Sequence, residues 1–206
     1  MTIVATESVA SFFDEVVEDA LKARQVDASH GAARYLVGVL SDFTRPDVAT
    51  REAFERPLTL VLQEALVTPS PAERFERLRH LGDAVLYASG FFADHFVARG
   101  VEPEYVFGIG SRAYGTASAM LRAGSSSTSV EEQARGIDVF SELADHFDQF
   151  ASVLAEVSDI TFAKNTAGAR GLLKLYEKWL RTGSDRLAGA LTERGLIPTR
   201  PVKGIQ

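Results

Sequence analysis

Residues 78–123 read LRHLGDAVLYASGFFADHFVARGVEPEYVFGIGSRAYGTASAMLRA, and they carry the clearest architectural signal in the sequence. It contains two helix-like runs, and each run carries a line of small residues where the rest of the chain places large ones. The first line is Gly82, Ser89 and Ala93, and the second line is Gly108, Ser111, Gly115 and Ser118. Because the connector at residues 100–102 is short, we expect the two helices to be antiparallel neighbours.

The two lines of small residues can be placed in register. The predicted antiparallel pairs are Ala93 with Gly108, Ser89 with Gly115, and Gly82 with Ala119. Each glycine inside a helix costs about 1 kcal/mol relative to alanine, so several in one helix need a compensating reason. The first interpretation is a close approach of the two backbones. The alternative is a ligand pocket between helices 71–99 and 103–123, lined by Gly82, Ser89, Tyr114 and Gly115.

Hydrophobic periodicity predicts a single all-α domain over residues 1–195. Apolar residues recur at spacings of three and four nearly everywhere, and alternation with a period of two is absent. We therefore expect a bundle of seven or eight helices, mostly antiparallel neighbours joined by short loops. The predicted helices span residues 7–26, 29–45, 50–67, 71–99, 103–123, 129–157, 166–182 and 185–194. Residues 196–206 contain two prolines and are predicted to form an extended C-terminal tail.

Local signals mark several helix ends. Ser70 is followed by Pro71 at the first helical position and by Glu73 at the third, which predicts a capped helix start. Pro57 lies inside the predicted helix 50–67, so we expect a kink or a restart there. The polar run at residues 124–129 predicts a loop.

The composition excludes several classes of function. The 206 residues carry a formal net charge of −6, which argues against binding to the phosphate backbone of nucleic acids. The absence of cysteine excludes disulfides, thiol nucleophiles and cysteine metal ligands. No apolar stretch approaches the roughly 20 residues that span a bilayer, and residues 1–10 lack the pattern of a signal peptide. We therefore expect a cytoplasmic protein without nucleic-acid or membrane partners.

One polar helix face is a candidate functional surface. His80, Asp83 and Tyr87 lie at positions i, i+3 and i+7, opposite the predicted apolar stripe, and Phe91 lies on the same face. A carboxylate beside a histidine is suited to acid–base chemistry or to half of a metal site. A face with this many charges is usually solvated, so our first interpretation is that it is solvent-exposed surface without a function. Exposed aromatic rings on it would instead indicate a face that binds a partner.

Catalytic and metal-binding motifs are absent from the sequence. Di-iron helical bundles use Glu-x-x-His, but none of the four histidines follows a glutamate at that spacing. The chain also lacks a Gly-x-Ser-x-Gly motif and a Walker loop. We therefore predict no catalytic residues, no metal site and no cofactor.

Several segments resemble known groups of proteins. LGD at residues 81–83 with YASGFF at 87–92, YVFGIGSRAYG at 105–115 and LYEKWLRTGSDRLAGALTERGLIP at 175–198 resemble a family of all-helical bacterial cytosolic proteins with no assigned activity. This resemblance implies no residue roles. The string RHLGD at 79–83, followed by Ser89 and Gly90, resembles the glycine-bearing distal helix of haem oxygenases. That resemblance implies a tetrapyrrole ligand, but the family's double glycine is missing and the candidate axial ligand His30 lies closer in sequence to Gly82 than in that family.

These observations predict a non-enzymatic helical interaction or regulatory protein that self-associates or binds a protein partner. The alternative is a binder of a flat apolar ligand such as a tetrapyrrole, or an enzyme that acts on one, with the ligand in the pocket between helices 71–99 and 103–123.

Overall fold

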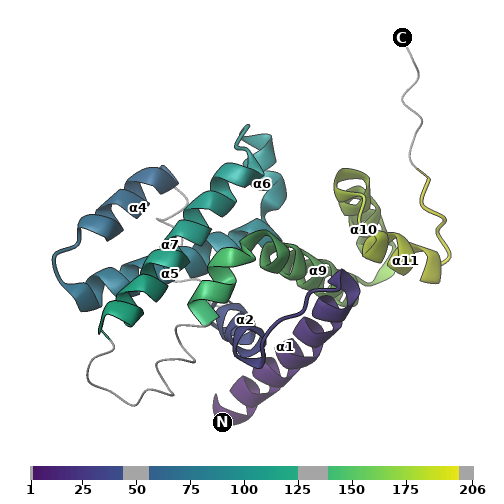
Figure 1. Cartoon of the computed structure of the whole chain (residues 1–206). Helices are drawn as coiled ribbons and strands as arrows, with labels where there is room; N and C mark the ends of the chain where they lie inside the picture. Colours follow the sequence, from purple (N-terminus) through teal and green to yellow (C-terminus); the bar gives the residue numbers. More distant parts are fainter. Residues whose placement is uncertain (1, 44–55, 125–138, 200–206) are drawn as a thin grey trace.

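The computed structural model describes residues 2–43, 56–124 and 139–199, and all regular secondary structure within these ranges is helical. The helices are α1 (Thr2–Arg24), α2 (His30–Phe43), α4 (Leu58–Val67), α5 (Pro71–Phe91), α6 (Ala93–Ala98), α7 (Pro103–Gly124), α9 (Phe147–Asn165), α10 (Gly168–Thr182) and α11 (Asp185–Glu193) (Figure 1). A further helical stretch at residues 139–145 precedes α9. The all-α prediction is therefore confirmed for the part of the chain that the structure describes.

Two helix starts follow the predicted signals. The hydroxyl of Ser70 accepts a hydrogen bond from the backbone N–H of Glu73 at 3.4 Å, which caps α5 ahead of Pro71. α4 begins directly after Pro57, where we predicted a kink or a restart, but the segment that would precede such a restart lies outside the described residues. The start of the predicted helix at residue 50, most of the predicted loop at 124–129 and the predicted helix start at 129 lie outside the described residues.

Two helices that we predicted as continuous are interrupted. The helix predicted over residues 71–99 breaks at Phe92, where φ is −130° and ψ is 25°, and divides into α5 and α6. The helix predicted over residues 129–157 breaks at His146, where φ is −122° and ψ is 33°, and α9 then extends to Asn165. Both residues at the breaks are exposed, so no burial of their side chains favours a straight helix there.

α5 and α9 are the central helices of the bundle. Residues 81–86 of α5 and residues 156–160 of α9 are buried around the whole helix circumference. α5 packs against α7 and α9, while α1 packs against α2 and α9 (Figure 1). Polar residues in the middle of these two helices therefore lie inside the protein and need partners there.

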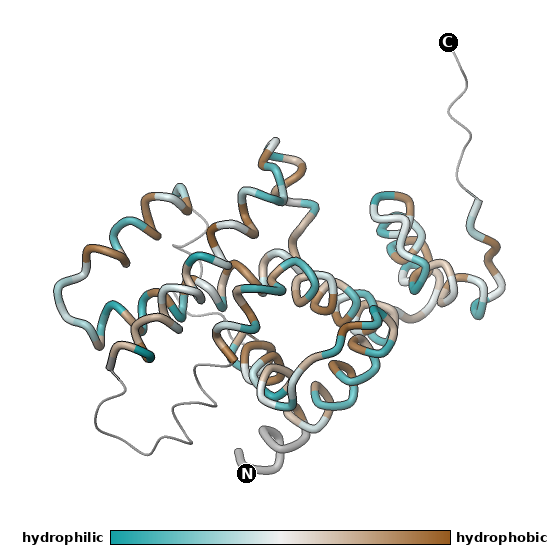
Figure 2. Tube along the Cα trace, in the orientation of Figure 1, coloured by the Kyte–Doolittle hydropathy of each residue, from teal (hydrophilic) through white to brown (hydrophobic). Residues whose placement is uncertain are grey.

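The C-terminal helices have an apolar core of their own. Gly183, with a φ of 67°, ends α10 in the left-handed conformation that glycine favours and turns the chain into α11. The buried residues of this second core are Ala163, Leu175, Trp179, Leu187 and Leu191. Figure 1 shows the α10–α11 hairpin beside the main bundle, and Figure 2 shows the mixed polar and apolar sequence of amphipathic helices along it.

The described part of the predicted tail is not helical. Residues 196–199 lack regular secondary structure, and the hydroxyl of Tyr176 donates a hydrogen bond to the carbonyl of Thr199 at 3.2 Å. Residues 200–206 lie outside the described residues. No helix among the described residues has both the length and the apolar character needed to cross a membrane.

Candidate functional site

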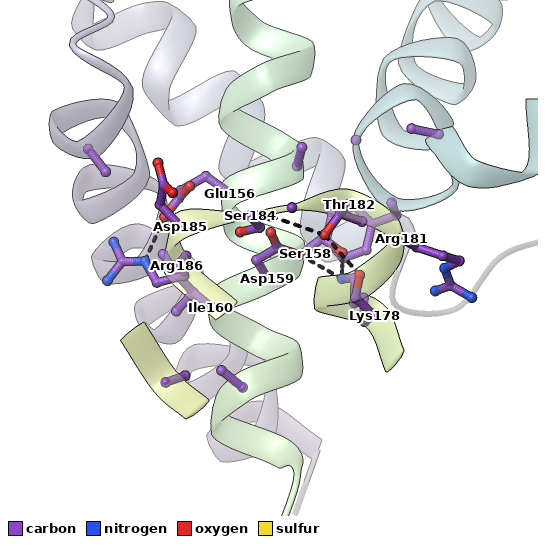
Figure 3. A pocket seen from close by; sticks show the side chains of 18 of the residues that line it. Glu156, Ser158, Asp159, Ile160, Lys178, Arg181, Thr182, Ser184, Asp185 and Arg186 are labelled. Carbon is purple, nitrogen blue, oxygen red and sulfur yellow. Dashed lines mark hydrogen bonds and ion pairs between the residues drawn. The ribbon is translucent and has the colours of Figure 1, made fainter. Parts of the chain in front are cut away.

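A cavity of about 1040 Å³ lies between the main bundle and the α10–α11 hairpin. Its walls come from the C-terminal ends of α1 and α5 and from α6, α9, α10 and α11. Small-molecule sites in proteins commonly enclose about 300–1,000 Å³, so this cavity is slightly larger than the upper end of that range. Figure 3 shows charged and hydroxyl side chains of α9, α10 and α11 around its centre.

α9 supplies the buried charges of the cavity. Glu156 and Asp159 are 5% and 6% exposed, and their spacing of three places them on one side of the helix. Ser158 is buried beside them, while Val157 and Ile160 belong to the main apolar core. A buried carboxylate is costly unless it is paired, so the partners of these two groups define the site.

Glu156 is bound by two arginines from opposite ends of the chain. The Nε of Arg186, in α11, donates a hydrogen bond to Oε1 at 2.6 Å. The Nε of Arg24, at the end of α1, lies 3.1 Å from Oε2. The side chains of both arginines are about 40% exposed, because only their inner atoms reach the carboxylate. Two cations on one anion give this group a formal charge of +1.

Asp159 is paired with Lys178 of α10. The Nζ of Lys178 lies 2.8 Å from Oδ1 of Asp159 and donates a hydrogen bond to Oγ of Ser158 at 3.2 Å (Figure 3). The same ammonium group lies 4.8 Å from the centroid of the Phe162 ring, within cation–π range. Because both charged groups are largely buried, salt in the solvent screens this pair only weakly. It therefore fastens α10 to α9.

The rim of the cavity carries a more exposed ion pair. The Nε of Arg181, in α10, lies 3.1 Å from Oδ2 of Asp94 in α6. Both side chains are exposed, so this pair contributes about 0–1 kcal/mol to stability. At the next turn of the chain, the Ser184 hydroxyl caps α11 by accepting a hydrogen bond from the backbone N–H of Leu187 at 3.4 Å.

A separate buried carboxylate lies in the middle of α5. The hydroxyls of Tyr35 in α2 and Tyr114 in α7 donate hydrogen bonds to Oδ1 of Asp83 at 2.6 and 2.8 Å, and Nη1 of Arg79 donates to Oδ2 at 3.1 Å. Burial raises the pKa of Asp83 above its ordinary value, against the opposite effect of these three donors. The group ties α2 and α7 to α5, so we assign it a structural role.

The expectation that this face of α5 is solvated was wrong. The Phe43 ring of α2 stacks on the Tyr87 ring at 4.7 Å and lies 6.3 Å from the His80 ring. Tyr87 in turn stacks on Phe91 at 4.6 Å. Asp83 is buried, and the other three residues of the predicted partner face are half-buried. The physical reason is that α2 packs on this face of α5 through Tyr35 and Phe43, so the face is covered and not free in solvent.

α5 and α7 are antiparallel neighbours as predicted (Figure 1), but their small residues do not pair as predicted. The Tyr114 ring occupies the space beside Gly82, where a Cβ would lie 2.6 Å from Cε1 of the ring. Ala119 was the predicted neighbour. The hydrogen bond from Tyr114 to Asp83 holds the ring in this place. The space that we predicted for a flat ligand at Gly82 is thus filled by Tyr114 itself.

The other predicted pairs in this seam also differ. A Cβ at Gly115 would lie 3.7 Å from Cβ of Ala144, so Gly115 faces the stretch at residues 139–145. The predicted neighbour, Ser89, is buried and donates its hydroxyl to the carbonyl of Val85 at 2.7 Å. At Gly108 the position of a Cβ has no neighbour within 4 Å. Of the residues predicted to line a pocket, Gly82, Ser89 and Tyr114 are fully buried in the core and Gly115 is half-buried.

The residues of the charged cavity were not identified from the sequence. These residues are Arg24, Glu156, Asp159, Lys178 and Arg186. The sequence did contain a signal for the two carboxylates, because they interrupt an apolar helical pattern at inward positions. The predicted helix ended at residue 157, however, so Asp159 was not placed on it. No local pattern indicates which cations meet them, since those come from α1, α10 and α11.

The described residues contain no group of three or more His, Cys, Asp or Glu side chains placed to hold a metal ion. The cavity is instead built from paired charges of opposite sign. A comparison of the chain with protein-family models, with curated proteins and with solved structures found no match.

Proposed function

We propose that this protein is a non-enzymatic regulatory protein that binds a small polar ligand in the cavity between the bundle and the α10–α11 hairpin. The proposal is carried by Glu156, a carboxylate 5% exposed on the cavity wall and paired with cations from α1 and α11. Buried ion pairs are weak sources of stability, and apolar residues of similar volume commonly replace them without loss. Their position on a cavity wall supports a role in ligand recognition.

The hairpin is the part of the fold that a ligand would influence most. Its apolar core is small and separate from that of the main bundle. Ion pairs join it to α9 and α6 at Asp159, Glu156 and Asp94. A ligand that contacts both walls favours the docked hairpin by its differential affinity for that state. Ligand occupancy would thereby control the position of α10 and α11.

Gly189→Trp tests the cavity directly. Gly189 lines the cavity, and the position of a Cβ there has no neighbour within 4 Å. The first atom of a tryptophan side chain therefore meets no clash there, and we expect the indole to occupy cavity space. Gly38→Trp is the matched control, because Gly38 is also an exposed helical glycine with no neighbour within 4 Å of its Cβ position and lies in α2, outside the cavity wall.

The measurement is isothermal titration calorimetry with a panel of organic acids, phosphate esters, amino acids and nucleosides. We expect at least one of these compounds to saturate a single site on the wild type and on Gly38→Trp, and Gly189→Trp to lose that binding. A panel without any binding would contradict the proposal. So would binding that Gly189→Trp retains.

Self-association is a second candidate function, and exposed Phe92 supports it. Phe92 is 53% exposed and packs edge-on against Tyr87 at 5.9 Å, so it extends the row of rings formed by Phe43, Tyr87 and Phe91 to the surface. We propose that a second copy of the chain covers this ring. Sedimentation equilibrium tests it: we expect the wild type to dimerise and Phe92→Ser to be monomeric, and a monomeric wild type would refute the idea.

A further inference from the structure

We propose that Arg24 and Arg186 recognise an anionic group of the ligand, a phosphate or a carboxylate. This inference rests on the proposed ligand-binding function of the cavity and specifies the chemical class of the ligand. It begins from the geometry around Glu156, where two guanidinium groups from distant parts of the sequence meet at a single carboxylate.

Each guanidinium faces Glu156 with its Nε atom. The distances are 2.6 Å from Nε of Arg186 to Oε1 and 3.1 Å from Nε of Arg24 to Oε2. A guanidinium has five N–H donors, and four of them are on the two Nη atoms. Within the described part of the chain, the Nη atoms of these two arginines donate to no other residue. Both arginines line the cavity, so their remaining donors are available to a ligand there.

The charges around the cavity favour an anion at this end. Glu156 neutralises only one of its two arginines, whereas Asp159 is matched by Lys178. The wall as a whole carries five cations and five carboxylates, because it also includes the exposed residues Lys164, Arg181, Asp94, Asp185 and Glu193. The positive charge is therefore local to the Arg24–Glu156–Arg186 group, whose two guanidinium groups are themselves about 40% exposed and can be reached by a ligand.

Glu156 is a positioning residue in this scheme. It holds two guanidinium groups, one from α1 and one from α11, at the two oxygens of one carboxylate. Phosphate and carboxylate groups have the geometry that guanidinium forks bind, with two parallel N–H···O bonds to each fork. An anion held by both forks would connect α1 to α11 and would oppose undocking of the hairpin.

Titration with inorganic phosphate in a low-salt buffer near neutral pH tests the inference. The readout is the chemical shift of the arginine Nε–H groups, together with calorimetry for the dissociation constant. We expect Arg24→Gln and Arg186→Gln each to weaken phosphate binding at least about ten-fold, because each removes charge-assisted hydrogen bonds. Arg170→Gln is the control, since Arg170 is an exposed residue of α10 that does not line the cavity.

Two further variants separate recognition from structural damage. Glu156→Gln removes the charge that holds both guanidinium groups in place, so we expect it to weaken phosphate binding about two- to ten-fold and to change the Nε–H chemical shifts of both arginines before phosphate is added. Unchanged Nε–H shifts in this variant would contradict the positioning role. Arg24→Lys keeps the charge but not the fork, and we expect an affinity between those of the wild type and Arg24→Gln. Circular dichroism verifies that each variant is folded.

The outcomes distinguish this inference from the proposed function. An absence of saturable phosphate binding, or binding that Arg24→Gln and Arg186→Gln retain, would overturn the anion site. If an uncharged or cationic compound binds in a way that Gly189→Trp abolishes and Arg24→Gln does not, the cavity function stands and the anion site fails. If Gly189→Trp affects no compound that binds, the cavity function fails as well.

Discussion

The hydroxyl of Tyr114 lies 2.8 Å from Oδ1 of Asp83, and this hydrogen bond determines how α7 packs on α5. The ring of Tyr114 fits because Gly82, the residue before Asp83, has no side chain. A buried acceptor and an adjacent small residue thus act together at one point of the core. The hydroxyl of Tyr35 in α2 donates a second hydrogen bond to the same oxygen of Asp83.

Gly82→Ala should destabilise the protein although alanine is the better helix former. A Cβ at this position would lie 2.6 Å from Cε1 of Tyr114, and crowding of a packed core costs about 1–3 kcal/mol. The gain in helix propensity is about 1 kcal/mol, so we expect a net loss of about 0–2 kcal/mol. Gly38→Ala, which adds a methyl group in open space on α2, should stabilise by about 0.5–1 kcal/mol.

Urea unfolding followed by circular dichroism measures both glycine variants. The informative quantity is the difference in unfolding free energy between Gly82→Ala and Gly38→Ala. Equal stabilisation by the two substitutions would show that the Tyr114 ring does not occupy the space beside Gly82.

Tyr114→Phe should cost about 1.5–3 kcal/mol, because it removes a hydrogen bond to a buried carboxylate and leaves the apolar packing unchanged. Tyr105→Phe provides the comparison, since Tyr105 is exposed at the start of α7 and its hydroxyl is dispensable. Surface changes of that kind stay within about 0.5 kcal/mol. Chemical denaturation of both variants decides the matter, and equal midpoints would argue against a role for the Asp83 group in stability.

The buried tyrosines should make the protein unstable in alkali. Burial and the charge of Asp83 raise the pKa of Tyr35 and of Tyr114 above the ordinary value of 10.0. Above that pH the unfolded chain loses phenolic protons that the folded chain keeps, so the unfolding free energy falls as pH rises. The slope is about 1.4 kcal/mol per pH unit for each such tyrosine.

Tyrosinate absorbance and circular dichroism, recorded together in a pH titration, test this behaviour. The tyrosinate signal of Tyr35 and Tyr114 should develop together with the loss of helix, and Tyr114→Phe should lower the slope of stability against pH. Complete ionisation of all tyrosines in a chain that is still helical would disprove the assignment.

Much of the fold could be predicted from the sequence, because its signals are local. α7 begins at Pro103 and α5 begins behind Ser70, where proline and a capping hydroxyl act within a few residues. The breaks at Phe92 and His146 were missed, since apolar spacing continues across both. The spacing of apolar residues does not show where side chains become exposed, and both breaks lie at exposed residues.

The candidate site could be predicted only in part, for a different reason. Asp83 was singled out on the helix that carries it, but a helical wheel assigned it to water because the wheel contains no information about α2. Glu156 was missed entirely, since its partners Arg24 and Arg186 come from α1 and α11. Ion pairs between distant helices depend on the tertiary arrangement, and a single sequence does not specify them.

The α10–α11 hairpin should be the part of the described fold that opens most readily. Its own apolar core is small, and its contacts with α9 and α6 include ion pairs that salt weakens. Raising sodium chloride from about 0.05 to about 0.5 M should accelerate amide hydrogen exchange in α10 and α11 more than in α5. Mass spectrometry of peptic fragments measures this, and an equal salt response in all helices would contradict it.

The two arginines that bind Glu156 are synthesised at different times. A chain emerges from its N-terminus and its first parts fold first, so Arg24 is already present when the glutamate is made, whereas Arg186 follows 30 residues later. A nascent chain that ends with α9 therefore holds this carboxylate with half of its partners. Synthesis of α11 then adds Arg186, which brings the second cation to this carboxylate and supplies a further wall of the cavity.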